Sequence, residues 1–171
     1  MTNYKKIIAI ITGAVILDQI TKGYMLWWAS RGQIPLMGDA WELVRHPYIM
    51  ERVTSFFNLV FTWNPGMSFS IGRGLGMYNQ LFIIALTGVI IGWLIHFLFS
   101  RSSAAYEKLP LALIVGGALG NFIDRLRFGA VIDFLDFHAF GIHWPAFNVA
   151  DIFIVTGAML YVVVYFINRR K

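Results

Sequence analysis

The sequence predicts an α-helical polytopic membrane protein with four transmembrane helices and a small extracytoplasmic β-sheet between the first two of them. The chain has 171 residues, enough for one membrane-embedded domain. It is 58% hydrophobic and 13% charged, whereas a soluble domain is typically about 45–50% apolar and about 25% charged. Four stretches are apolar over roughly the 20 residues that cross a bilayer core. They cover about residues 5–28, 77–100, 109–127 and 145–167.

Lysine and arginine predict the orientation of these spans, because both residues accumulate on the cytoplasmic side. With four spans, the two termini and the loop near residues 101–108 lie on one side of the membrane. That side holds Lys5, Lys6, Arg101, Lys108, Arg169, Arg170 and Lys171. The loop 129–144 holds no lysine or arginine, and those of the loop 29–76 are spread over many more residues. We therefore expect both termini to be cytoplasmic.

The first extracytoplasmic loop, about residues 29–76, contains a predicted strand. Ser55–Trp63 is rich in Phe, Val, Thr and Trp, the composition of a β-strand. Asn64-Pro65-Gly66 follows directly and is typical of a turn. We expect a small sheet that lies on the membrane surface.

Uncommon polar side chains occur near the extracytoplasmic ends of the spans. Charges at that depth are costly, so they are usually paired or functional. Asp18 and Lys22 share one helix face and could form an ion pair, or Lys22 could extend to the interface. Asp124 and Arg125 could likewise pair at the end of the third span. Glycines such as Gly117 just before them favour close helix packing.

Asp133 and Asp151 form the most informative pair of acidic residues. Asp133 lies in an apolar stretch where a carboxylate is out of place, and Asp151 lies at the start of the fourth span. An aspartate at a helix start is often only a cap. Two carboxylates brought close together, however, cannot both stay ionised, so they supply one base and one acid. That arrangement is the one used by aspartic proteases.

Four motifs together resemble one family, the lipoprotein signal peptidases (signal peptidase II). Asp18–Lys22 resembles the first-helix motif, and Asn64–Phe69 resembles the outer-loop Asn-x-Gly segment. Gly116–Leu126, followed by Gly129–Phe134, resembles the third-helix block. Trp144–Asp151 resembles the fourth. Order and spacing match over nearly the whole chain.

The resemblance implies an aspartic endopeptidase that removes signal peptides from diacylglyceryl-modified bacterial prolipoproteins, before the lipidated cysteine. It implies that Asp133 and Asp151 are catalytic, and that no cofactor or metal takes part. The other matched positions support the site or contact substrate: Asn64, Gly66, Asn121, Arg125, Asn148, Asp18, Lys22, Asp124 and Gly117. Departures from the family pattern occur at Met67-Ser68 and Ile152-Phe153 and affect only local pocket shape. We expect a monomer whose partners are the prolipoproteins and membrane lipids.

Two other classes of function remain as alternatives. Asp124-Arg125, Gly129, Asp133 and Asp136 loosely resemble the metal-binding run of CDP-alcohol phosphotransferases, but the leading Asp-Gly-x-x-Ala-Arg block of that family is absent. A small transporter would place charges near mid-membrane, often with inverted repeats, and this sequence shows neither.

The net charge of +5 is explained by membrane orientation, so no nucleic-acid partner is expected. The chain has no cysteine, which excludes a cysteine nucleophile. His96, His138 and His143 are interpreted as packing or surface residues.

Overall fold

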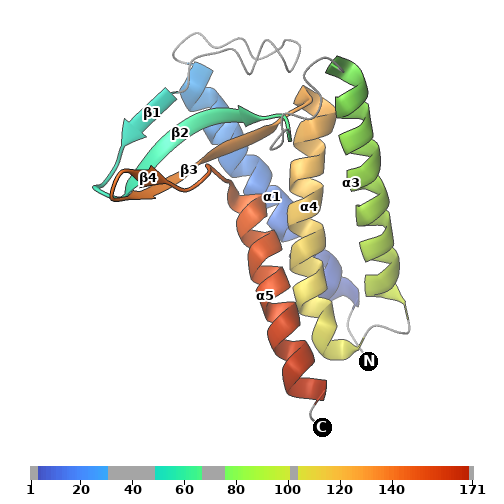
Figure 1. Ribbon diagram of the computed structural model, residues 1–171. Helices are drawn as coiled ribbons and strands as arrows, with labels where there is room; N and C mark the ends of the chain where they lie inside the picture. Colours follow the sequence, from blue (N-terminus) through green and yellow to red (C-terminus); the bar gives the residue numbers. More distant parts are fainter. Residues whose placement is uncertain (1–3, 31–48, 67–75, 101–103, 170–171) are drawn as a thin grey trace. The chain divides into compact units, whose positions relative to one another are not determined.

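A computed structural model describes residues 4–30, 49–66, 76–100 and 104–169 of the chain. Four long helices occur in these ranges, each long and apolar enough to cross a membrane, which confirms the predicted spans (Figure 1). They are α1 (Tyr4–Ser30), α3 (Gly76–Phe99), α4 (Lys108–Phe128) and α5 (Val149–Arg169). A 3₁₀ turn, η1 (Ala105–Glu107), precedes α4. The last helix begins at Val149 rather than near residue 145.

An antiparallel four-stranded sheet has the order β1-β2-β3-β4. Its strands are β1 (Ile49–Arg52), β2 (Phe57–Asn64), β3 (Val131–Ala139) and β4 (Ile142–His143). β1 and β2 confirm the sheet predicted between the first two spans, whereas β3 and β4 come from the segment between α4 and α5. The sequence did not reveal β3, because its first residues are buried on both faces and therefore lack polar–apolar alternation.

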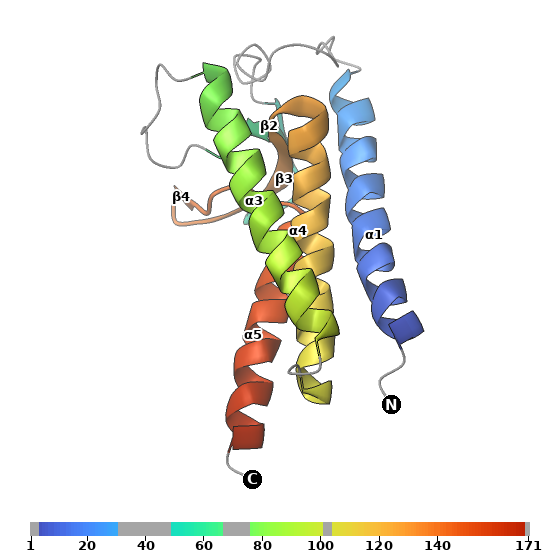
Figure 2. The same ribbon diagram turned by 90° about the vertical axis from the view of Figure 1, so that its right-hand side faces the viewer.

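The chain divides into two compact units, and the first consists of residues 1–19, 85–122 and 149–171. Its core is formed by apolar side chains of α1, α3 and α4, namely Ile7, Leu98, Leu111, Ala112 and Val115. Figure 2 shows α3 crossing in front of α4, and the shared core joins the two helices. Glycines let the helix backbones approach closely. A Cβ at Gly116 would lie 2.7 Å from the Ala14 Cβ, and one at Gly157 would lie 2.7 Å from the Pro110 carbonyl oxygen.

The second unit, residues 20–84 and 123–148, holds the sheet together with the adjoining helix ends. β2 and β3 form its centre, where Val60, Phe61 and Ile132 are buried. The ring of Trp63 packs against that of Phe128, the last residue of α4, with centroids 5.3 Å apart. The sheet is therefore fixed to the end of a membrane-spanning helix.

We predict that Gly157→Ala destabilises the protein although it lies outside the candidate site. The added methyl group would meet the Pro110 carbonyl oxygen and the Ile114 side chain at 2.7 and 2.8 Å. Overpacking of this kind costs about 1–3 kcal/mol. Thermal unfolding in detergent should therefore show a lowered midpoint.

Gly92→Ala on α3 is the matched control, because a Cβ there meets nothing within 4 Å. Alanine favours a helix over glycine by about 1 kcal/mol, so the midpoint of this variant should stay the same or rise. Equal midpoints for the two variants would contradict the proposed close contact of α4 and α5.

Candidate active site

Asp133 is a buried carboxylate held by two asparagine amides. It lies on β3 and is only 2% exposed. Asn64 Nδ2 donates to one carboxylate oxygen at 2.9 Å, and Asn148 Nδ2 donates to the other at 2.6 Å. Both oxygens are thus oriented by neutral donors from separate segments, one at the end of β2 and the other just before α5. The structure brings together three of the predicted site residues here.

A β-bulge in β2 places Asn64 on the same face of the sheet as Asp133. Leu59 pairs with Leu135 and Thr62 pairs with Asp133, so two residues of β2 oppose one residue of β3 between these pairs. A bulge shifts the register by one residue and so exchanges the two faces of the strand. Without it, Asn64 would point to the face opposite Asp133.

The turn after β2 orients the Asn64 amide. The backbone N–H of Gly66 donates to Asn64 Oδ1 at 2.9 Å, which leaves Nδ2 to donate to Asp133. Gly66 has a φ of 79°, and a Cβ there would lie 3.2 Å from Ile83 Cδ1. Both the backbone conformation and the limited space therefore require glycine.

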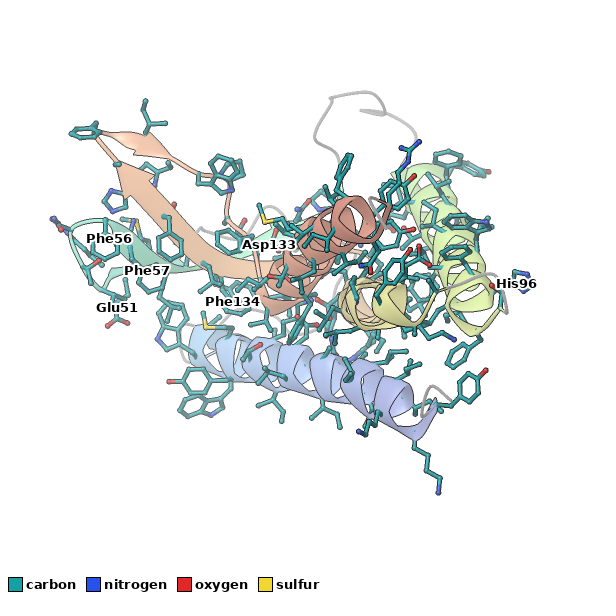
Figure 3. All side chains as sticks on the ribbon, turned by 90° about the horizontal axis from the view of Figure 1, so that it is seen from below. Glu51, Phe56, Phe57, His96, Asp133 and Phe134 are labelled. Carbon is teal, nitrogen blue, oxygen red and sulfur yellow. The ribbon has the colours of Figure 1, made fainter. Side chains whose placement is uncertain are left out.

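An open hollow of about 260 Å³ lies over Asp133. It is lined by residues of β2 and of the segment leading to α5, including Thr62, Trp63, Pro145 and Ala146. Figure 3 shows Asp133 at the end of the sheet remote from Phe56 and Phe57. The Asp133 carboxylate is thus available to a molecule that enters this hollow.

Asp151 lies in the first turn of α5, where Asn121 Nδ2 donates to its Oδ1 at 2.8 Å. Asp18 of α1 caps the same helix, because its Oδ1 accepts the Ala150 N–H at 3.0 Å. Asp18 is completely buried. A Cβ at Gly120 would overlap its carboxylate, and one at Gly117 would overlap the Ala150 carbonyl oxygen. The two glycines therefore allow α1 and α5 to pack on α4.

Lys22 and Asp124 form a buried ion pair with 2.9 Å between Nζ and Oδ2. Asp124 Oδ2 also accepts the Ile132 N–H at 3.3 Å, which connects α4 to β3. Sequence spacing favoured Asp18 as the partner of Lys22 and Arg125 as the partner of Asp124, because each lies close by on the same helix. The observed ion pair joins two different helices, which spacing does not indicate. Lys22 and Asp124 thus have structural contacts.

A Cβ at Gly66 would lie 3.8 Å from Arg125 Nη2, which places that guanidinium beside the Asn64 turn.

A second polar cluster lies on the opposite face of β3. Asn58 Nδ2 donates to Asp136 at 2.8 Å, and His143 Nδ1 lies 2.9 Å from the same carboxylate. Burial raises the pKa of the Asp136 carboxyl. The hydrogen bonds from Asn58 and His143 and the charges of His143 and His138 lower it by more, so its pKa lies below the usual value. From the sequence, His138 and His143 were expected to be ordinary surface residues, and the contact of His143 with Asp136 was not predicted. Among the described residues, no group of three or more His, Cys, Asp or Glu side chains is arranged to hold a metal ion.

Comparison with known proteins identifies the family of the chain. The family model described as signal peptidase (SPase) II matches residues 10–167. The chain belongs to the signal peptidase II family. As a member of this family, the protein is a peptidase that removes signal peptides. Its four apolar helices fit multi-pass insertion in a bacterial membrane.

Individual relatives of this signal peptidase II extend over most of its length. It is 42% identical over 152 residues to the lipoprotein signal peptidase of Ralstonia nicotianae, covering 87% of this chain and 77% of the relative. It is 45% identical over 131 residues to that of Aeromonas hydrophila, covering 76% and 78%. A solved bacterial membrane enzyme superposes with a TM-score of 0.71 at 28% identity, covering 94% of this chain and 92% of the other.

We predict that the Asp136 carboxylate stabilises the sheet only above acidic pH. Because its folded pKa is lowered, its contribution is complete above the unfolded pKa of about 3.9 and is lost as pH falls through the folded pKa. The thermal midpoint of the wild type should therefore exceed that of Asp136→Asn at neutral pH. The difference should shrink below about pH 4. A difference that stayed constant across this range would contradict the assignment.

Proposed function

We propose that this signal peptidase II removes the signal peptide from diacylglyceryl-modified prolipoproteins by cleaving before the lipidated cysteine, with Asp133 and Asp151 as the catalytic pair. The observation that carries the proposal is the Asp133 carboxylate, buried and held by two amides beneath an open hollow. Asp151 has a similar partner in Asn121. The relatives from Ralstonia and Aeromonas are lipoprotein signal peptidases, which supports the substrate class.

Chain connectivity supports joint action of the two aspartates. Asn148, which holds Asp133, stands three residues before Asp151 in the sequence. Three extended residues span at most about 11 Å, which limits the distance between the Cα atoms of Asn148 and Asp151. In the proposed mechanism the two aspartates share one proton, as the pair of an aspartic protease does.

The chemistry follows from this shared proton. The ionised aspartate takes a proton from water while the water oxygen attacks the scissile carbonyl carbon. The protonated aspartate donates its proton to the carbonyl oxygen. The tetrahedral intermediate then collapses: the aspartate that took the proton from water gives it to the amide nitrogen, the C–N bond breaks, and the amine of the lipidated cysteine leaves. The other aspartate recovers its proton from a hydroxyl of the intermediate as the carboxyl product forms. Acid–base roles of this kind contribute about 10²–10⁴-fold.

The supporting residues position these groups and the substrate. Asn64, Asn148 and Asn121 orient the carboxylates, and Gly66 holds the Asn64 turn. Asp18, Lys22, Asp124 and Gly117 hold the helix ends, and Arg125 lies beside the turn. With both termini cytoplasmic, the site lies near the extracytoplasmic surface, and the substrate's acyl chains can stay in lipid. A single chain acts alone and uses no metal.

We predict that Asp133→Asn and Asp151→Asn each lower the cleavage rate by at least about 10²-fold, because either change removes the base or the acid. The matched control is Asp136→Asn, which alters a carboxylate on the opposite face of the same strand. It should keep most of the wild-type rate. Cleavage of a diacylglyceryl-modified prolipoprotein by purified protein in detergent measures all three.

A chelator in every reaction tests metal independence, and an unlipidated precursor tests substrate choice. Wild-type turnover by a folded Asp133→Asn or Asp151→Asn protein would refute the aspartate pair. Loss of wild-type cleavage on adding chelator would contradict the proposed metal-free mechanism.

We predict that Asn148→Ala lowers kcat more than it changes KM, since Asn148 orients a catalytic group. A hydrogen bond to a charged group is worth about 1.5–3 kcal/mol, which corresponds to roughly 10- to 100-fold in rate. Asn58→Ala is the control, as Asn58 makes the same contact with Asp136. Equal kcat losses for the two variants would indicate a purely structural role for Asn148.

A further inference from the structure

The hairpin of β3 and β4 exposes apolar side chains at its tip. Phe140 in the turn is fully exposed, at 104% of its reference area, and Ile142 and Trp144 are 75% and 69% exposed. Residues 137–148 contain no Lys, Arg, Asp or Glu. Contiguous exposed apolar surface of this kind marks a site of interaction.

The turn itself is unfavourable for its side chain. Phe140 and Gly141 connect the strands in a two-residue turn, with φ values of 53° and 77°. Such a type I′ turn favours Asn-Gly, and a bulky residue in this left-handed conformation is an outlier. Phe140 is thus both strained and exposed, although Asn would fit the same turn without strain. Outliers of this sort commonly mark functional positions.

The hairpin has one apolar face and one polar face. The register pairs His138 with His143 and Ala139 with Ile142. Alternation therefore places Ile142, Trp144 and Phe137 on one face, which is also the face of Asp133. The other face carries Asp136, His138 and His143. An open hollow of about 560 Å³ is lined by residues of the hairpin, with Phe137, Phe140 and Trp144 beside His138 and His143.

Both ends of the hairpin are attached to membrane spans. β3 begins at Val131, just after α4 ends at Phe128, and Trp144 lies five residues before α5 begins at Val149. The hairpin is therefore attached at the level of the helix ends, where bilayer and water meet. Tryptophan is enriched at that boundary.

We infer that the tip of this hairpin inserts into the extracytoplasmic leaflet of the bilayer, with Phe140, Ile142 and Trp144 among the acyl chains and the His138–His143 face toward water. The partner is therefore bulk phospholipid, bound through apolar contact as an amphipathic segment binds an interface. This role goes beyond peptide cleavage and does not depend on which residues catalyse it.

The natural absence of cysteine allows a direct test, since one introduced cysteine becomes the only thiol. Phe140→Cys and Ile142→Cys would each carry a nitroxide spin label in vesicles of phosphatidylethanolamine and phosphatidylglycerol. Collision with oxygen, which concentrates among acyl chains, should exceed collision with a water-soluble nickel chelate at both positions. Glu51→Cys, an exposed position on β1 of the same sheet, should give the opposite order. Nickel accessibility at residues 140 and 142 equal to that at residue 51 would overturn the inference.

A second variant separates lipid insertion from packing. Phe140→Asn should keep or raise the thermal midpoint in detergent, because Asn suits the turn, while the label at residue 142 becomes more accessible to nickel. A lowered midpoint would show that Phe140 packs within the fold and would overturn the inference.

The apolar face could instead be covered by a second copy of the chain or by substrate, and each would give a different pattern of label accessibility. Protection that disappears when the protein is diluted within the vesicles would indicate a second copy of the chain. Protection that appears only after a prolipoprotein is added would indicate substrate. Either result would overturn the inference and leave the proposed peptidase function intact, because label accessibility is measured without catalysis.

Discussion

The contact between Asp18 and the start of α5 is the constraint on which the membrane part of the structure depends. The first N–H groups of a helix have no partner within the helix, and lipid offers none. Asp18 supplies an acceptor from α1, and its carboxylate also complements the positive end of the helix dipole. Close approach is possible only because Gly120 and Gly117 lack side chains. Three helices therefore meet at Ala150, and Asp151 is fixed one residue further on.

The other polar groups near this level are also matched across elements. Lys22 of α1 reaches Asp124 of α4, and Asp124 in turn holds the backbone of β3. Removing one partner of a buried pair is strongly destabilising, because the remaining charge stays buried. The ion pair therefore gives Lys22 and Asp124, two of the predicted site residues, a structural role. Asp124 contacts the Lys22 ammonium, while the amides of Asn64 and Asn148 donate to Asp133 and that of Asn121 donates to Asp151.

The sequence was sufficient for the spans and for β2, because long apolar runs and a β-rich segment are local signals. It was insufficient for β3 and β4. The first part of β3 is buried on both faces, and the turn at Phe140-Gly141 lacks the usual Asn-Gly signal. The motifs located Asp133 and Asp151, but not the partner of Lys22 or the contact of His143 with Asp136. Such partners come from distant segments, and sequence spacing alone favours neighbours on one helix.

The β-bulge explains why the candidate site needs both extracytoplasmic segments. β2 carries Asn64 and β3 carries Asp133, and each strand alone has no means of bringing the amide to the carboxylate. Regular pairing from Leu59 onward would turn Asn64 to the opposite face. One additional residue between Leu59 and Thr62 corrects the register after the apolar pairs have formed. The same pairing that buries Val60, Phe61 and Ile132 therefore also builds the hydrogen bond to Asp133. Stability of the sheet and geometry of the site are consequently set by a single register.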